Sequence, residues 1–140
     1  MDNHASTNAE STERLRALVA TLSGADLERS LGGGWTVGFA FVHLAFWDHR
    51  QVAALRQFER GEGFPSEDYA TNATLSLVAP IFDLSAAGQA AVNAAQELDA
   101  MVESLSVDQL TKLQESGKSY AIDRAPHRDE HLQQIEEALG

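Results

Sequence analysis

The sequence predicts an all-α fold, a four-helix bundle, and three observations support this prediction. Apolar residues recur at intervals of three and four through most of the 140 residues, as they do in amphipathic helices. The segment 35–47 is apolar on nearly every side of a helical wheel, which indicates a helix surrounded by other helices. No segment has the pattern of a strand, and the short joints between the helical segments favour a bundle.

Length and composition exclude several classes of protein. A chain of this length forms about one domain, which we place at residues 1–140 with residues 1–8 as a flexible polar tail. Without cysteine there is no disulfide, and 21 acidic against 10 basic residues give a formal charge of −11, which disfavours nucleic-acid binding. Because no apolar run is long enough to span a membrane and the N-terminus does not resemble a signal peptide, we expect a cytoplasmic protein with no membrane partner.

A stripe of apolar residues predicts a first amphipathic helix from about Thr7 to Leu22. Ser23 has the chemistry of an N-cap and begins a second helical segment of one or two turns. Three glycines at positions 32–34 end this segment. The members of the first stripe are Leu15, Leu18, Val19 and Leu22.

The central helix is expected to begin after Thr36, a suitable N-cap, and to run to about Arg60. Its second half becomes amphipathic. We expect Val52, Leu55 and Phe58 to face the interior and Arg50, Gln57 and Glu59 to face water. A glycine- and proline-containing loop follows at residues 61–66.

The third helical stretch is expected to begin near Ser66 or Glu67 and to reach about Ser104, with a kink or interruption at Pro80. After a short helical turn at residues 106–110, the polar segment 114–123 reads as an exposed connection. The last helix should begin between Arg124 and Pro126. Two apolar stripes define the buried faces of these helices: Ala91, Ala95, Leu98, Val102 and Leu105, and then His131, Leu132, Ile135 and Leu139.

Two histidines lie four residues apart in the segment His127-Arg-Asp-Glu-His131. On a helix they share one face, about 5–6 Å apart at Cβ, and Leu132 and Ile135 on the same face direct both imidazoles into the bundle. His127 also lies near the helix N-terminus, where the helix dipole favours the neutral, ligating imidazole. His43, in the apolar middle of the central helix, is the natural third ligand.

Three neutral imidazoles, with water in the remaining positions, describe a catalytic rather than a structural metal site. Zinc, nickel, copper and iron(II) all suit such ligands, and the sequence does not choose among them. Two alternatives stay open: the pair can lie on a solvated helix face, and His43 can be a core histidine with a polar partner. The general base of His-Glu-x-x-His zinc proteases is absent, because Arg128 follows His127.

Other polar residues of the central helix have weaker claims to a role. His49 points about 120° away from His43 and is read as a surface residue or as a support for a ligand. Asp48 can accept a hydrogen bond behind a ligand, but a surface charge is the favoured interpretation. Trp47 lies one turn from His43 and can form a wall of the site, but plain core packing is the favoured interpretation.

Outside the central helix, Asn72 can donate a hydrogen bond near the site or cap a turn. Tyr120 and Arg124 precede the histidine pair and can contact an anionic substrate, with a loop position of no function as the alternative. His4, in the polar tail, is given no role.

Several short motifs together resemble the DinB/YfiT-like superfamily, which includes the N-terminal domain of mycothiol-dependent maleylpyruvate isomerases. They are Trp35-Thr-Val, His43-Leu-Ala-Phe-Trp-Asp, Asn72, and His127-Arg-Asp-Glu-His131-Leu, and they follow one another with the order and spacing of the family over nearly the whole chain.

The resemblance implies an up-down-down-up bundle of four helices with a divalent metal ion bound by His43, His127 and His131. It also implies a homodimer. Zinc or nickel is the expected metal, and the family includes transferases and isomerases that use the bacterial thiols mycothiol or bacillithiol, as well as metal-dependent hydrolases. The first hypothesis is therefore a metal-dependent enzyme that activates water or a small thiol toward a small electrophilic substrate. The alternative is a non-catalytic bundle that binds metal or dimerises.

Overall fold

The computed structural model describes residues 4–140, and this part of the chain is mostly helical, which confirms the all-α prediction. Four helices are long: α1 (Ala5–Thr21), α3 (Val37–Glu59), α5 (Leu84–Ser104) and α7 (Ala125–Leu139). Three are shorter: α2 (Gly24–Leu27), α4 (Tyr69–Val78) and α6 (Val107–Glu115). Short 3₁₀ helices, η1 (Ala79–Ile81) and η2 (Ser119–Ala121), precede α5 and α7.

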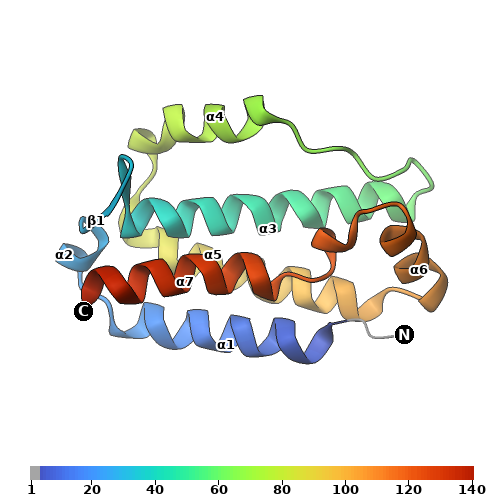
Figure 1. Ribbon diagram of the computed structural model, residues 1–140, viewed down its shortest axis with the longest axis horizontal. Helices are drawn as coiled ribbons and strands as arrows, with labels where there is room; N and C mark the ends of the chain where they lie inside the picture. The colour runs from blue at the N-terminus through green and yellow to red at the C-terminus, as the bar shows by residue number, and fades with distance from the viewer. Residues whose placement is uncertain (1–3) are drawn as a thin grey trace.

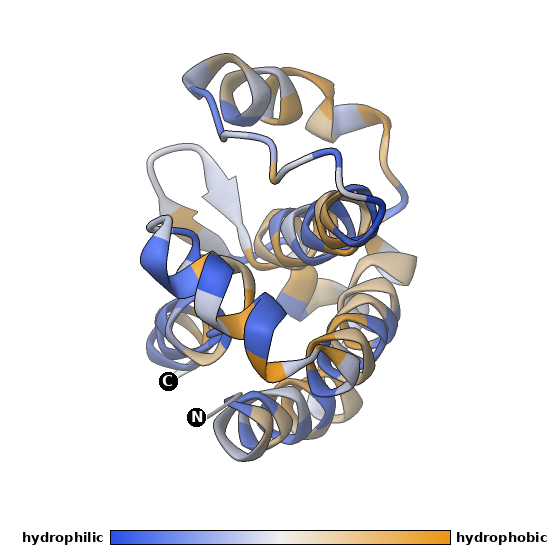
Figure 2. Cartoon of the chain, turned by 90° about the vertical axis from the view of Figure 1, so that its right-hand side faces the viewer, coloured by the Kyte–Doolittle hydropathy of each residue, from blue (hydrophilic) through white to orange (hydrophobic). Residues whose placement is uncertain are grey.

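The long helices lie side by side, with α1 and α7 running in one direction and α3 and α5 in the other (Figure 1). The most extensive packing joins α3 to α5, and α1 packs on both α5 and α7. Helix α4 is set apart on the outer side of α3, as the end-on view of Figure 2 also shows. The chain returns along α4 from the end of α3 to the start of α5.

The structure corrects the expectation that the chain contains no strand. β1 (Ser30–Gly32) and β2 (Trp35–Thr36) form a short antiparallel hairpin. Its turn is made by Gly33 and Gly34, whose φ angles of 62° and 83° are accessible to glycine at little cost. The strands are too short to show an alternating pattern, so the sequence signal was only the glycine run.

Of the two outcomes expected at Pro80, the structure shows the interruption, and the third helical stretch is two helices, α4 and α5. Asp68 caps α4 through the Thr71 amide, and Asp83 caps α5 through the Ser85 amide. Between them Pro80 lies in η1 and Phe82 is extended, so the chain changes direction there. A proline ring excludes the hydrogen bond that would continue an α-helix, which is why this joint is a break.

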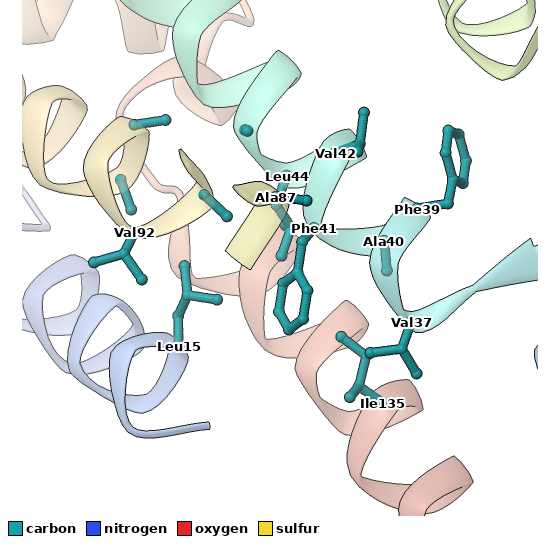
Figure 3. Packing of buried hydrophobic residues seen from close by; sticks show 14 of the residues in the cluster. Leu15, Val37, Phe39, Ala40, Phe41, Val42, Leu44, Ala87, Val92 and Ile135 are labelled. Carbon is teal, nitrogen blue, oxygen red and sulfur yellow. The ribbon is translucent and has the colours of Figure 1, made fainter. Parts of the chain in front are cut away.

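The core occupies the space between the long helices. Figure 3 shows one cluster in which Leu15 of α1, Phe41 of α3, Val92 of α5 and Ile135 of α7 converge. A second cluster lies toward α6 and includes Leu55, Leu98 and Leu113. None of the helices described by the structure is long and apolar enough to cross a membrane.

Two segments that were expected to be exposed contribute to the interior. Ala121 and Ile122, in the connection before α7, are fully buried in the second cluster. In the N-terminal segment, residues 5–8 belong to α1, and the buried Asn8 side chain donates a hydrogen bond to the carbonyl of Ile122 at 2.7 Å. Residues 1–3 of the expected flexible tail lie outside the described residues. The polar composition of these two segments predicted exposure, but the hydrogen bond of Asn8 holds the N-terminal segment against the connection before α7.

Candidate metal centre

The three histidines singled out in the sequence meet between α3 and α7. His43 comes from α3, and His127 and His131 come from successive turns of α7. The Nε2 atoms of His43 and His127 are 3.1 Å apart. One ring nitrogen from each of the three residues lies within 4.8 Å of the others, so the group could hold a divalent metal ion.

Local sequence explains why these side chains converge. Thr36 accepts a hydrogen bond from the Phe39 amide and begins α3, whose buried residues surround His43. Pro126 occupies the first turn of α7, a position where its missing N–H has no helical partner to lose. Helical spacing then places His131 one turn beyond His127, with ring centroids 5.0 Å apart.

Aromatic rings pack around the histidines. Trp35, on the β hairpin, lies nearly parallel to the His131 ring, with centroids 5.6 Å apart and an interplanar angle of 15°. The same indole lies 4.9 Å from the ring of His43. On the other side Trp47 approaches His43 at 6.5 Å, and its N–H donates to Asn72 Oδ1 of α4 at 3.1 Å. The hairpin that the sequence did not reveal thus supplies one wall of the site.

Burial favours the neutral imidazoles. Desolvation is the main cause that lowers the pKa of His43 from 6.5 to about 4, with the nearby His131 and Arg124 adding to it. Desolvation also lowers the pKa of His127 to about 2, and the positive charge of Arg124 is its next cause. Both rings are therefore uncharged near pH 7 and can offer a lone pair to a metal ion.

Two of the three donors have nearly the spacing of ligands on one tetrahedral ion. Two imidazole nitrogens on one tetrahedral zinc lie about 3.4 Å apart, given metal–nitrogen bonds of about 2.0–2.1 Å, and the two Nε2 atoms of His43 and His127 are close to that separation at 3.1 Å. In addition, the buried His43 Nδ1 has no hydrogen-bond partner among the described residues. A buried ring nitrogen without a polar partner costs free energy whatever the other nitrogen binds, so this atom does not by itself indicate a metal ligand.

Behind His127 lies a group of buried charges, which we call the Asp48 cluster: Asp48, Arg124 and Arg128. Asp48 accepts hydrogen bonds from Arg124 Nε and Arg128 Nε, both at 3.0 Å. Arg128 reaches further, to the Asp99 carboxylate at 2.8 Å and to Thr12 Oγ1 at 3.0 Å. The cluster therefore joins α1, α3, α5 and α7 directly behind the histidines.

The Asp48 cluster corrects two sequence interpretations. Asp48 was read as a surface charge, yet it is only 1 % exposed. Arg124 was read as a contact for an anionic substrate or as a loop residue without function, and its guanidinium is instead buried and contacts both Asp48 and His127. Arg128 was missed altogether, although it precedes Leu132 and Ile135 by four and seven residues and so belongs to the buried stripe of α7.

Hydrogen bonds support the two histidines of α7 differently. Gln134 Oε1 lies 3.1 Å from His131 Nδ1, and Arg124 Nη2 lies 3.3 Å from His127 Nδ1. An amide oxygen accepts a hydrogen bond, whereas a guanidinium only donates. The two Nδ1 atoms therefore have opposite roles.

A cavity of about 520 Å³ lies beside the histidines, between α3, α4 and the start of α7. His43 and His127 line it together with Trp47, Tyr120 and Arg124. Asp68, Tyr69 and Asn72 line it from the α4 side. A small molecule in this cavity would contact the two histidines directly.

The other residues considered in the sequence, His49, Asn72 and His4, do not belong to the histidine cluster. His49 is a surface residue, as expected, with 53 % of its side chain exposed and its Nδ1 3.8 Å from Glu97. Asn72 serves as the acceptor for the Trp47 indole rather than as a cap. His4 Nδ1 lies 3.7 Å from the Asp123 carboxylate.

Comparison with known proteins shows the family. The model of the DinB superfamily matches residues 8–135, so the chain belongs to this superfamily. No curated protein and no solved structure matches the chain. The resemblance noted in the sequence is thus confirmed at the level of the superfamily.

Proposed function

We propose that this DinB superfamily member is a metal-dependent enzyme whose divalent ion, zinc or nickel, is held by His43, His127 and His131. One observation carries the proposal: three imidazoles from two helices converge, two of them with lowered pKa, and His43 and His127 line a cavity. Three imidazole ligands leave coordination positions for water or substrate, as in catalytic sites. We interpret the four long helices as the up-down-down-up bundle of the superfamily.

The reaction class follows from this ligand set. A divalent ion held by neutral imidazoles lowers the pKa of a bound water or thiol and polarises a carbonyl. The chain's own residues define where that chemistry takes place: Trp35 and Trp47 exclude water from the sides of the imidazoles, and the cavity admits a small electrophile. We propose transfer of a low-molecular-weight bacterial thiol, mycothiol or bacillithiol, to this electrophile, or its hydrolysis.

Elemental analysis tests the metal site. Wild-type protein should contain one equivalent of zinc or nickel after loading, and the His43→Ala and His131→Ala variants should contain none. His49→Ala is a matched control, because it removes an exposed histidine from the same helix and should leave the metal content unchanged. A wild-type protein that takes up no metal under any loading condition would refute the site.

Activity needs a separate experiment. The metal-loaded protein is incubated with an electrophilic substrate and, in turn, mycothiol, bacillithiol or water alone, and each reaction is repeated after removal of the metal by a chelator. Turnover that depends on the metal and on one thiol supports the transferase, and metal-dependent turnover without a thiol supports the hydrolase. Turnover that is unchanged after removal of the metal contradicts both the transferase and the hydrolase proposal.

The alternative is a dimerising bundle without catalytic activity, and one feature favours its dimer. Leu77 of α4 and Ile81 of η1 are large apolar residues that are 80 % and 82 % exposed. Such side chains suit an interface between two copies of the chain. Sedimentation of the wild type beside Leu77→Ser tests the dimer, which the variant should weaken. A protein that stays dimeric after its metal is removed would show that dimerisation does not depend on metal binding.

A further inference from the structure

A second cavity, of about 370 Å³, lies where α4 and the joint before α5 meet α3 and α5. Its innermost lining consists of the buried Val42 and Ala45 of α3, Leu75 of α4 and Ala87 of α5. In Figure 3 the Val42 side chain leaves α3 in a direction away from Phe41, which packs between the long helices. No residue lines both this cavity and the cavity beside the histidines. The second cavity is therefore a separate space, which we call the α4–α5 cavity.

Small side chains leave this space open. On α5 the lining is made by Ala86, Ala87 and Ala90, none of which reaches across to α4. On α4 the one buried residue is Leu75, so this helix sends little into the gap. Protein interiors are normally packed without voids much larger than a water molecule. The α4–α5 cavity is thus a departure from ordinary packing.

The lining is apolar on the inside and polar only at the rim. The innermost side chains are all aliphatic. The two polar side chains are exposed: His49, which lies beside Glu97, and Asp83, which accepts a hydrogen bond from the Ser85 amide at the start of α5. A charged group inside the cavity would lose its water without gaining a partner. The cavity therefore suits the body of an uncharged molecule.

Two phenylalanines complete the walls of the α4–α5 cavity. The Phe46 ring is held edge-on against Trp47, with centroids 5.3 Å apart, and Phe82 lies exposed in the joint between η1 and α5. Aromatic rings favour offset or edge-to-face contact with another ring. The volume is near the lower end of the range of ligand pockets, about 300–1,000 Å³, and an apolar cavity of about 150 Å³ already holds benzene. The space thus accommodates a molecule of one or two rings.

We propose that the α4–α5 cavity is a binding site for an uncharged aromatic molecule of one or two rings, separate from the histidine site. Removal of the ligand's apolar surface from water favours binding. The ligand would contact Leu75 and Phe82, and so it would supply packing that α4 does not find in the chain itself. The inference goes beyond the proposed function and does not depend on a metal ion.

The first measurement needs no variant. Metal-free wild-type protein is titrated with 2-naphthol, an uncharged two-ring probe, and methyl signals are followed by NMR. We expect saturable shifts at Val42 and Leu75 and little change at Leu113, which belongs to the other core cluster. Shifts centred on Tyr120 or Asn72, which line the histidine cavity, would overturn the assignment. So would the absence of any saturable shift.

Probes with a charge test the chemical class of the ligand. The same two rings carry a negative charge in 2-naphthoate and a positive charge in 2-naphthylmethylamine. Because the interior of the cavity offers a charge no polar partner, both should bind at least about tenfold more weakly than 2-naphthol. Equal affinities for the three probes would contradict the selection of an uncharged molecule.

A filled cavity should no longer bind the probe. Ala90 lines the cavity and is partly buried, so the larger side chain of Ala90→Leu enters the open space and should weaken 2-naphthol binding at least about tenfold. Ala100→Leu is the matched control, because it makes the same change on an exposed position of α5 and should bind like the wild type. Ala86→Leu narrows the same cavity from its exposed rim and replaces Ala90→Leu if that variant does not fold. Wild-type affinity in the filled variant would overturn the proposal.

Amide exchange gives a readout in the helix that covers the cavity. Saturating 2-naphthol should slow exchange in residues 69–78, because the probe packs on Leu75 and stabilises the closed position of α4. Unchanged exchange in α4 would contradict the predicted contact. All these measurements use metal-free protein, so a failure of the proposed metal site leaves them unaffected, and a failure to bind 2-naphthol leaves the metal test unaffected.

Discussion

The histidine site has two walls that are built in opposite ways. On the α7 side, Asp48 is 1 % exposed and is held by two buried arginines whose hydrogen bonds reach all four long helices. On the α4 side, Leu75 is the one buried residue of the helix, and Tyr69, which lines the cavity, is 88 % exposed. The histidines of the proposed metal site therefore rest on the strongly anchored wall, and the cavity is completed by a wall with few buried residues.

Removal of the Asp48 carboxylate is expected to have the largest effect. Asp48→Asn leaves the buried Arg124 guanidinium without a counter-charge and leaves Arg128 with Asp99 alone, which should lower the free energy of unfolding by about 3–5 kcal/mol. Urea unfolding followed by circular dichroism measures this loss. Glu59→Gln, an equal change of charge on the exposed end of α3, is the control and should change stability by less than about 0.5 kcal/mol. A small effect of Asp48→Asn would mean that the two walls do not differ as described.

Low pH is expected to lower the stability of the protein through the buried His43. The folded-state pKa of His43 is lowered to about 4, so the metal-free unfolded chain takes up a proton as the pH falls below about 6.5 while the folded protein does not. The stability contributed by neutral His43 is complete above pH 6.5 and is lost between about pH 6.5 and 4. At about 1.4 kcal/mol per pKa unit, the loss is about 3 kcal/mol.

Chemical unfolding of the metal-free protein at intervals between pH 7.5 and pH 4 checks this slope. His43→Leu should remove the part of the slope that belongs to His43, and His49→Leu, which changes an exposed histidine, should retain it. Equal slopes for the two variants would contradict the assignment.

The hydrogen bond between Trp47 and Asn72, which joins the two walls, should contribute less to the free energy of unfolding. Asn72→Ala removes the acceptor of the Trp47 indole N–H, which joins α4 to α3, and should cost about 1 kcal/mol. Asn72→Asp retains an acceptor and serves as the matched control. Faster exchange of the Trp47 indole proton with solvent in the alanine variant, but not in the aspartate variant, would identify the bond; equal exchange in both would show that it contributes nothing.

The smallest effect on global stability is expected in α4 itself. Leu75→Ala would cost about 2–5 kcal/mol if α4 unfolded together with the core. Because Leu75 is the only buried residue of α4, we expect a loss of less than about 1 kcal/mol in global unfolding and faster amide exchange confined to residues 69–78. A full loss in the cooperative transition would show that α4 is as firmly anchored as α7.

Much of the fold and the identity of the three histidines could be predicted from local patterns. Apolar spacing indicated the long helices, Thr36 and Ser23 were recognisable as caps, and both caps are present in the structure. His127 and His131 share a face by helical geometry alone. The apolar surroundings of His43 in the sequence predicted its burial.

The sequence alone thus determined the helical class, the inward faces and the set of histidines, because each depends on periodicity within one helix. Only the tertiary structure decided that Trp35 packs on the histidines, that Asp48 is buried, and that Arg124 donates to His127. The first two features join residues that are 76 to 96 positions apart or come from different elements, and the third joins residues three positions apart but depends on Asp48 of α3, which holds Arg124 in place. A charged residue looks the same in sequence whether it faces water or a partner brought by another helix, and only the packed chain supplies that partner.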